Sequence, residues 1–199
     1  MSKAATDSKL HELLRQASKR LHHELDHHPI LTPLLRSDLN QLEYGNALAS
    51  LHGVHAVAEA WILDCLAQYP LAFDYHCRRK LAALNSDLGS LGRTPIPFRL
   101  EFSPGKSVAS LIGVLYTLEG ATQGGQFIAR NLQASSFKNI QLAFFRGYGD
   151  LNRQRWLEFL EFADAQCPSG SYGEAVSATV SLFAVIKAHL DSCAASLRQ

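Results

Sequence analysis

The sequence predicts a single all-helical domain, and three observations lead to this prediction. Apolar residues recur at three- and four-residue steps along most of the chain, which is the spacing of one face of an α-helix. Tandem repeats, low-complexity tracts and long polar linkers do not occur, so residues 1–199 are expected to form one domain. A length of 199 residues also lies below the roughly 250 at which chains tend to split. We therefore expect a bundle of seven or eight helices.

Two long helical patterns occupy the first third of the chain. An apolar stripe predicts a helix over residues 7–26, which Pro29 closes because proline cannot continue a helix. Ser37 or Asp38 is suited to cap a second helix that reaches residue 69. The two patterns predict neighbouring helices joined by a short connection.

The remaining elements follow the same spacing. A third helix is predicted over 73–88, and the proline-containing stretch 89–105 is predicted to be a loop with a short extended piece at 98–102. Ser103 followed by Pro104 is expected to open a helix that reaches residue 132. Further helices are predicted over residues 137–145, 151–165 and 173–192.

Composition excludes several functional classes. With 47% apolar residues, 19% charged residues and a formal net charge of +1, the chain is typical of a globular protein and not of a nucleic-acid binder. The apolar runs are shorter than a membrane span, and the first residues lack the apolar core of a secretory signal. We expect a cytoplasmic protein without a membrane segment, with its four cysteines as free thiols.

Four glycines interrupt one of the most apolar helical patterns. Gly113, Gly120, Gly124 and Gly125 lie within it, and each interior glycine costs a helix roughly 0.8–1 kcal/mol relative to alanine. Close packing of another helix would compensate for this cost. Close approach of the backbone to a flat ligand would also do so, although the pattern alone favours close packing.

Histidines are the second unusual feature. On the first helix, His22 falls on the flank of the apolar stripe, whereas His23 points away from it. His22 is therefore placed either as a structural histidine or as a ligand that looks into a pocket.

Three segments together resemble the haem oxygenases. Ala17-Ser-Lys-Arg-Leu-His-His-Glu-Leu-Asp26 resembles their proximal helix, and Gly113-Val-Leu-Tyr-Thr-Leu-Glu-Gly-Ala-Thr-Gln-Gly-Gly-Gln126 resembles their distal helix. Phe144-Phe-Arg-Gly-Tyr-Gly149 is similar to the subgroup encoded beside bacterial phytochromes. The segments occur in the order and at the separations of that family, so the resemblance covers nearly the whole chain.

The resemblance implies a fold and a set of haem contacts. It implies a haem-oxygenase-like multi-helical bundle, with haem between a proximal N-terminal helix and a glycine-kinked distal helix. His22 would be the axial iron ligand, and an arginine at each of two positions would bind the haem propionates, because guanidinium suits carboxylates. The implied cofactor-binding residues are His22, Arg15, Gly120, Gly124, Gly125 and Arg146.

The resemblance also implies a reaction, which is O₂-dependent opening of haem to biliverdin with release of iron and CO. Gly120 and Gly124 would place the distal backbone next to the haem, and Thr122, Gln123 or Gln126 would help to order water there. One departure concerns Ala121, where many members of the family carry an aspartate. Distal water must then be held in another way.

Partners follow from what the sequence lacks. It contains neither a nucleotide-binding fingerprint nor an iron–sulfur cysteine cluster, so electrons must come from a separate donor such as a ferredoxin or a flavoprotein reductase. A bacterial phytochrome is a possible acceptor of the biliverdin. The main alternative is a non-enzymatic haem carrier or sensor on the same fold, which Ala121 favours.

Two metal-site alternatives are weaker. His23-Glu24-Leu25-Asp26-His27 matches the HExxH pattern of zinc hydrolases, but Pro29 ends the helix directly afterwards and no third-ligand segment follows. His52, His55 and Glu59 share one side of the second helix and could hold a metal, although ordinary hydrogen-bonded roles are favoured.

Overall fold

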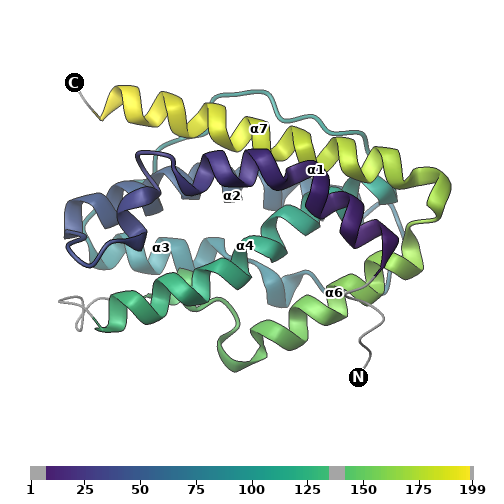
Figure 1. Cartoon of the computed structure of the whole chain (residues 1–199), viewed down its shortest axis with the longest axis horizontal. Helices are drawn as coiled ribbons and strands as arrows, with labels where there is room; N and C mark the ends of the chain where they lie inside the picture. The colour runs from purple at the N-terminus through teal and green to yellow at the C-terminus, as the bar shows by residue number, and fades with distance from the viewer. Residues whose placement is uncertain (1–7, 135–141, 198–199) are drawn as a thin grey trace.

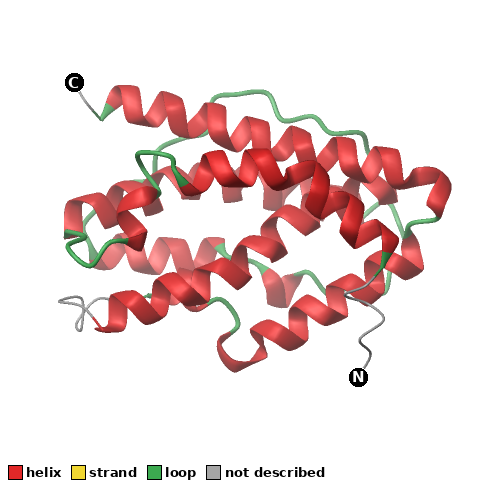
Figure 2. Cartoon of the chain, in the orientation of Figure 1, coloured by secondary structure: helices red, strands yellow, loops and turns green. Residues whose placement is uncertain are grey.

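The structure is a computed structural model that describes residues 8–134 and 142–197, and within these residues it contains helices and no strands (Figure 2). The α-helices are α1 (Lys9–Asp26), α2 (Gln41–Leu66), α3 (Leu81–Ser90), α4 (Val108–Ala134), α5 (Ala143–Arg146), α6 (Asn152–Gln166) and α7 (Tyr172–Ser196). Short 3₁₀ helices are η1 (Thr32–Leu35), η2 (His76–Arg78), η3 (Gly149–Leu151) and η4 (Ser169–Ser171). The all-helical prediction is confirmed.

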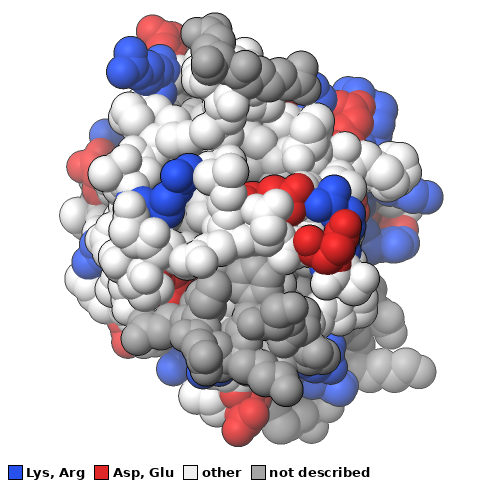
Figure 3. Space-filling model, turned by 90° about the vertical axis from the view of Figure 1, so that its left-hand side faces the viewer, with Lys and Arg blue, Asp and Glu red and all other residues white. Residues whose placement is uncertain are grey.

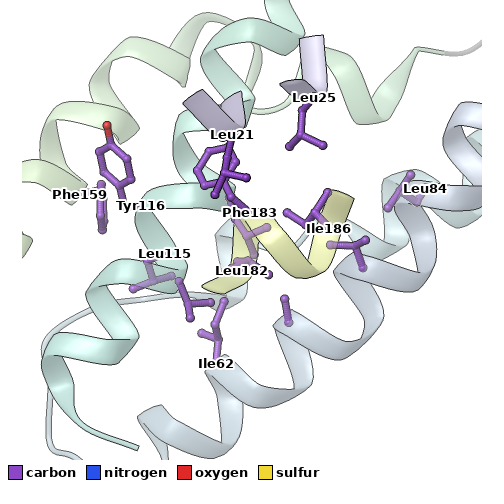
Figure 4. Packing of buried hydrophobic residues seen from close by; sticks show 14 of the residues in the cluster. Leu21, Leu25, Ile62, Leu84, Leu115, Tyr116, Phe159, Leu182, Phe183 and Ile186 are labelled. Carbon is purple, nitrogen blue, oxygen red and sulfur yellow. The ribbon is translucent and has the colours of Figure 1, made fainter. Parts of the chain in front are cut away.

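Helix α7 is the central packing element of the bundle. Helices α1 and α4 both pack against it, and α4 also contacts α5 and α6 (Figure 1). Leu21 and Leu25 of α1 lie beside Phe183 and Ile186 of α7 in the core (Figure 4). Burying a side chain of this size stabilises the fold by about 1.5–3 kcal/mol. The apolar stripe predicted for the first helix is therefore the surface by which α1 is held on α7.

Helix α7 is also the one segment of the described chain that is long and apolar enough to cross a membrane, over 169–196. Its buried residues include Thr179, Phe183 and His189, which pack inside the bundle. A central helix of a bundle has this same composition, so length and hydropathy here carry no argument for a membrane span.

Two helices begin later than predicted. Helix α2 is capped by Asn40, not by Ser37 or Asp38, because Asn40 and Glu43 form a reciprocal capping box. Helix α4 begins at Val108, and the hydroxyl of Ser107 accepts a hydrogen bond from the Ser110 amide at 3.0 Å. The Ser103-Pro104 start predicted for this helix is therefore wrong, since the cap lies four residues further on.

The segment 73–88 is not one helix. It forms η2 and then α3, which starts at Leu81, because the buried carboxylate of Glu59 accepts hydrogen bonds from the amides of Lys80 and Leu81. The extended piece expected at 98–102 forms no strand and belongs to the loop between α3 and α4. Of the helix predicted over 137–145, residues 137–141 lie outside the described residues.

Candidate functional site

One side of α1 carries His11, Ser18 and His22. At 100° per residue these three positions fall within about 40° of one another around the helix. The side chain of His22 is 61% exposed, so this side of α1 is not part of the core at that point. His22 Nδ1 lies 3.0 Å from Asp26 Oδ2, and its ring centroid lies 6.0 Å from that of Phe183. The carboxylate fixes the ring and leaves Nε2 as the nitrogen that can bind a ligand.

One side of α4 carries Tyr116, Gly120, Gly124 and Phe127, which are four, four and three residues apart. A Cβ placed on Gly124 would meet no atom within 4 Å, and a Cβ on Gly120 would meet only Trp156, at 3.8 Å. Phe127 is 53% exposed. This side of α4 is therefore bare backbone over two turns, followed by an exposed aromatic ring.

The two sides meet at one end. The ring of His11 lies 6.0 Å from that of Tyr116 and 5.8 Å from that of Trp156, and a hydrogen bond joins Tyr116 to Ser18. From this contact α1 and α4 run in the same general direction and separate toward the left of Figure 1. Since Ser18 and Tyr116 point toward each other, His22 lies one turn beyond the contact on one wall.

Gly124 lies two turns beyond the same contact on the opposite wall. We call this arrangement the α1–α4 site, with His22 on one side and Gly120, Gly124 and Phe127 on the other. The cavities of about 320 Å³, lined by residues such as Leu63 and Phe73, and about 170 Å³, lined by residues such as Pro29 and Leu197, both lie elsewhere.

The other two glycines of α4 serve packing. A Cβ on Gly113 would lie 2.2 Å from the carbonyl oxygen of Ala175, so α4 and α7 touch here at backbone distance. A Cβ on Gly125 would lie 3.1 Å from the carbonyl oxygen of Phe145, which brings α5 against α4. Gly113 and Gly125 thus realise the packing explanation. Approach of the backbone to a ligand at Gly120 and Gly124 stays a prediction.

Thr122 lies on a different side of α4 from Gly120 and Gly124. It is buried, and its Oγ1 donates to the carbonyl of Leu118 at 3.2 Å. Its Cγ2 lies 2.5 Å from where a Cβ of Gly147 would be, and Gly147 has a positive φ of 58°. The structure does not bring the Thr122 hydroxyl to the α1–α4 site, whereas Ala121 is exposed.

The segment 144–149 forms a tight turn against that side of α4. Tyr148 donates its amide to Asn152 Oδ1 at 2.8 Å, and Asn152 Nδ2 donates to the carbonyl of Arg146 at 2.8 Å. Gly147 is required here, because any side chain would collide with Thr122 and with Asn152. These contacts give the Phe-Phe-Arg-Gly-Tyr-Gly motif a structural explanation.

The two predicted propionate contacts come from separate elements. Arg15 is exposed, lies two turns before His22 on α1, and forms an ion pair with Glu12 at 2.9 Å. Arg146 ends α5 and is exposed, and its charge acts on the buried Asp87 of α3. Their role toward a ligand stays a prediction.

A buried polar network supports α4 next to Gly120. Glu119 is 2% exposed and pairs with Arg78 at 2.8 Å, and Tyr148 donates its hydroxyl to the second carboxylate oxygen at 2.8 Å. Burial raises the pKa of Glu119, while Arg78 and Tyr148 stabilise its charged form. The Lys80 Nζ lies 3.2 Å from the centroid of the Tyr148 ring, and burial lowers the pKa of Lys80 to about 8.

Replacing Lys80 with methionine is expected to remove a rise in stability between about pH 8 and pH 10.5. The folded protein gives up the Lys80 proton near pH 8, whereas the unfolded chain holds it up to the ordinary pKa of 10.5, so wild-type stability gains from rising pH in this window. Urea unfolding of both proteins from pH 7 to 10.5 measures this difference. Buried tyrosines and cysteines titrate in both proteins and cancel in the comparison. Parallel curves would contradict the assignment of Lys80.

The alternative metal sites receive no support from the described residues, among which no group of three His, Cys, Asp or Glu side chains is placed to hold a metal. The rings of His23 and His27 stack at 4.2 Å, and His27 Nδ1 is bound to the carbonyl of His23. His52 contacts Asn85, and Glu59 is occupied by Arg79 and the start of α3. The HExxH match therefore comes from the end of an amphipathic helix.

Sequence reasoning did not identify Asp26, Tyr116, Trp156 or Phe127 as parts of the site. Asp26 is four residues after His22 and Phe127 is three after Gly124, so helical spacing could have shown both. Trp156 belongs to α6, and only the folded structure shows that it lies next to Gly120. The residues present suit a flat, largely apolar group held by one histidine: bare backbone on one wall, a carboxylate-oriented imidazole on the other, and aromatic rings on both.

No protein-family model matches the chain, and no curated protein sequence matches it. Several solved structures, however, are similar to the chain. The haem oxygenase of Neisseria meningitidis, in crystal structures with NO and CO bound, is similar with a TM-score of 0.74 at 19% identity, over 92% of this chain and 91% of that one. The haem oxygenase of Leptospira interrogans gives a TM-score of 0.72 at 13% identity, over 93% and 100%.

Haem oxygenase-1 of the cyanobacterium Synechocystis, solved in complex with haem, gives a TM-score of 0.70 at 15% identity, over 96% of this chain and 95% of that one. The chain therefore has the haem-oxygenase fold, and the predicted fold class is confirmed. Its resemblance to the subgroup encoded beside bacterial phytochromes stays a prediction.

Proposed function

We propose that the protein is a haem oxygenase, which binds haem at the α1–α4 site and opens it to biliverdin with release of iron and CO. The observation that carries the proposal is the placement of His22. In a chain with the haem-oxygenase fold, α1 carries an exposed histidine oriented by a carboxylate, and α4 carries two glycines with bare backbone, which together support the proposal. When bound, haem supplies the iron at which O₂ is activated and is itself the substrate.

Each wall of the site has a proposed part. His22 Nε2 would hold the iron through neutral imidazole, while Asp26 orients the ring through its contact with Nδ1. Gly120 and Gly124 would let the α4 backbone lie close to the other haem face. Arg15 and Arg146 would bind the propionates.

Water at the α4 wall would have to be held by a group other than an aspartate, because Ala121 has no polar side chain. Gly125 holds α4 on α5, and Thr122 is hydrogen-bonded to the α4 backbone. We propose that Thr122 contributes by fixing this backbone, whose carbonyls can order water without an ionisable group.

The proposed setting is cytoplasmic. Electrons would come from a ferredoxin or a flavoprotein reductase, and a bacterial phytochrome is a possible acceptor of the biliverdin. Viewed from the side at which α1 and α4 stand apart, charges of both signs are scattered over a largely uncharged surface (Figure 3). Among the described residues, this view shows no broad basic patch of the kind that nucleic acid would require.

An aerobic turnover tests the proposal. The purified protein loaded with one haem is mixed with ascorbate or a ferredoxin system, with catalase present because free peroxide destroys haem without an enzyme. We expect loss of the Soret band, release of CO, and one biliverdin isomer identified by chromatography.

The second candidate is a haem carrier or sensor on the same fold, and the observation that favours it is the exposed Ala121 at the α4 wall. A carrier would keep its Soret band under reductant and O₂. A pigment mixture equal to that of uncatalysed degradation would likewise contradict the oxygenase and support the carrier.

A further inference from the structure

The exposed ring of Phe127 has no explanation in the fold itself. A large apolar side chain gains by burial, yet Phe127 is 53% exposed on α4. Its neighbours one and two turns back on the same side of the helix are Gly124 and Gly120, which have no side chain on which the ring could rest. One turn further on, Arg130 turns back to its own helix and donates Nε to the carbonyl of Gln126 at 3.3 Å.

The three residues together form an angled surface. Gly120 and Gly124 provide a flat floor on which a Cβ would find open space or the edge of Trp156. The Phe127 ring stands at the end of this floor, away from the contact between Tyr116 and Ser18. A planar macrocycle that lies on the floor would therefore have the aromatic Trp156 and Tyr116 at one end and Phe127 at the other.

We propose that Phe127 is a haem-contacting residue that fixes the in-plane position of the haem at the α1–α4 site, and thereby determines which meso carbon is opened. This inference rests on the proposed function. Its physical basis is that an aromatic ring against the edge or face of a porphyrin buries area on both partners and resists sliding and rotation of the haem in its plane. The glycines alone give no such resistance, because bare backbone is nearly featureless along the helix.

The test compares Phe127→Ala with Leu42→Ala. Leu42 is 58% exposed on α2, so both variants remove an exposed apolar side chain, and neither is expected to change the unfolding temperature of the haem-free protein appreciably. Haem loss is measured as transfer from the loaded protein to excess apomyoglobin. We expect transfer about tenfold faster from Phe127→Ala and unchanged from Leu42→Ala.

Two further readouts separate the contact from a general loss of apolar area. Phe127→Leu keeps an apolar side chain without the ring, and we expect it to restore most of the haem retention but not the product pattern. Wild type should give one biliverdin isomer, and Phe127→Ala and Phe127→Leu should give mixtures.

The failures are distinguishable. If Phe127→Ala loses haem at the wild-type rate and forms one unchanged isomer, the inference about Phe127 is overturned while the proposed function stands. The exposed Phe127 ring would then be a surface for another macromolecule. A wild-type protein that binds no haem would overturn the proposed function, and the role of Phe127 with it. Haem binding without turnover would contradict a role of Phe127 in selecting the meso carbon. The transfer rates would then decide whether Phe127 contacts the haem.

Discussion

Gly113→Ala is expected to destabilise the protein by about 2–4 kcal/mol, which corresponds to a fall of roughly 6–12 °C in Tm for a chain of this size. The added Cβ would lie 2.2 Å from the Ala175 carbonyl oxygen and 3.0 Å from the Thr179 amide nitrogen, both backbone atoms of α7. These atoms can move only if the two helices separate. Separation would also weaken the hydrogen bond from Thr179 Oγ1 to the Gly113 carbonyl, which is 3.0 Å long.

Gly124→Ala is the matched control on the same helix. No atom lies within 4 Å of the new Cβ, so the only effect on the haem-free protein is the helix propensity of alanine, a gain of about 0.5–1 kcal/mol. Thermal and urea unfolding of the haem-free proteins measure both changes. Equal destabilisation by the two substitutions would mean that Gly124 is also a packing glycine.

A branched residue at Gly124 extends this comparison to function. Gly124→Val is expected to fold, and to lower turnover or to change which meso carbon is opened, because its side chain occupies the space next to the haem. Normal turnover by a folded, haem-loaded Gly124→Val would remove the functional reason proposed for this glycine.

The contrast between these glycines shows where sequence reasoning ends. Interior glycines at four positions indicated that something unusual happens along α4, and that indication was correct. Whether a glycine meets a helix or open space depends on what lies opposite, and α7 contributes its contact from more than 60 residues further along the chain. Spacing within one helix carries no information about that partner.

Helix existence was predictable for a related reason, and helix ends were not. Apolar periodicity is a property of each segment, so α1, α2, α4, α6 and α7 were all expected. The starts of α2 and α3 depend on which polar side chain caps the helix. Asn40 caps α2 in place of Ser37 or Asp38. The Glu59 carboxylate accepts the Lys80 amide at the start of α3, from 21 residues away.

The buried polar network beside Gly120 could not be predicted from the sequence. Arg78 and Glu119 are 41 residues apart, and Glu119 and Tyr148 are 29 apart, so no local pattern connects them. The same reasoning applies to Thr122. Its neighbours in sequence suggested a place beside the distal glycines, but the turn at Gly147 occupies the side of α4 on which Thr122 lies.

His22→Ala is expected to abolish the histidine-ligated haem spectrum and to weaken haem binding strongly. His22 lies on the same side of α1 as Ser18, which contacts Tyr116 of α4, and its Nε2 is the nitrogen left for a ligand. His23→Ala is the matched control, since His23 is the next residue, is also exposed, and stacks on His27 instead. Absorption spectra of the ferric and ferrous haem complexes measure both variants, and His23→Ala should match wild type.

Two additions make this test specific to ligation. Free imidazole should restore a histidine-like spectrum to haem-loaded His22→Ala, because the substitution leaves space beside the iron and replaces a side chain that is 61% exposed. Asp26→Asn should keep the ligand but weaken haem binding about tenfold, since it removes the carboxylate that orients Nδ1. Loss of the spectrum in His23→Ala with retention in His22→Ala would shift the proximal register by one residue. The imidazole of α1 would then no longer face the bare backbone of α4, and the geometry on which the proposed reaction rests would be wrong.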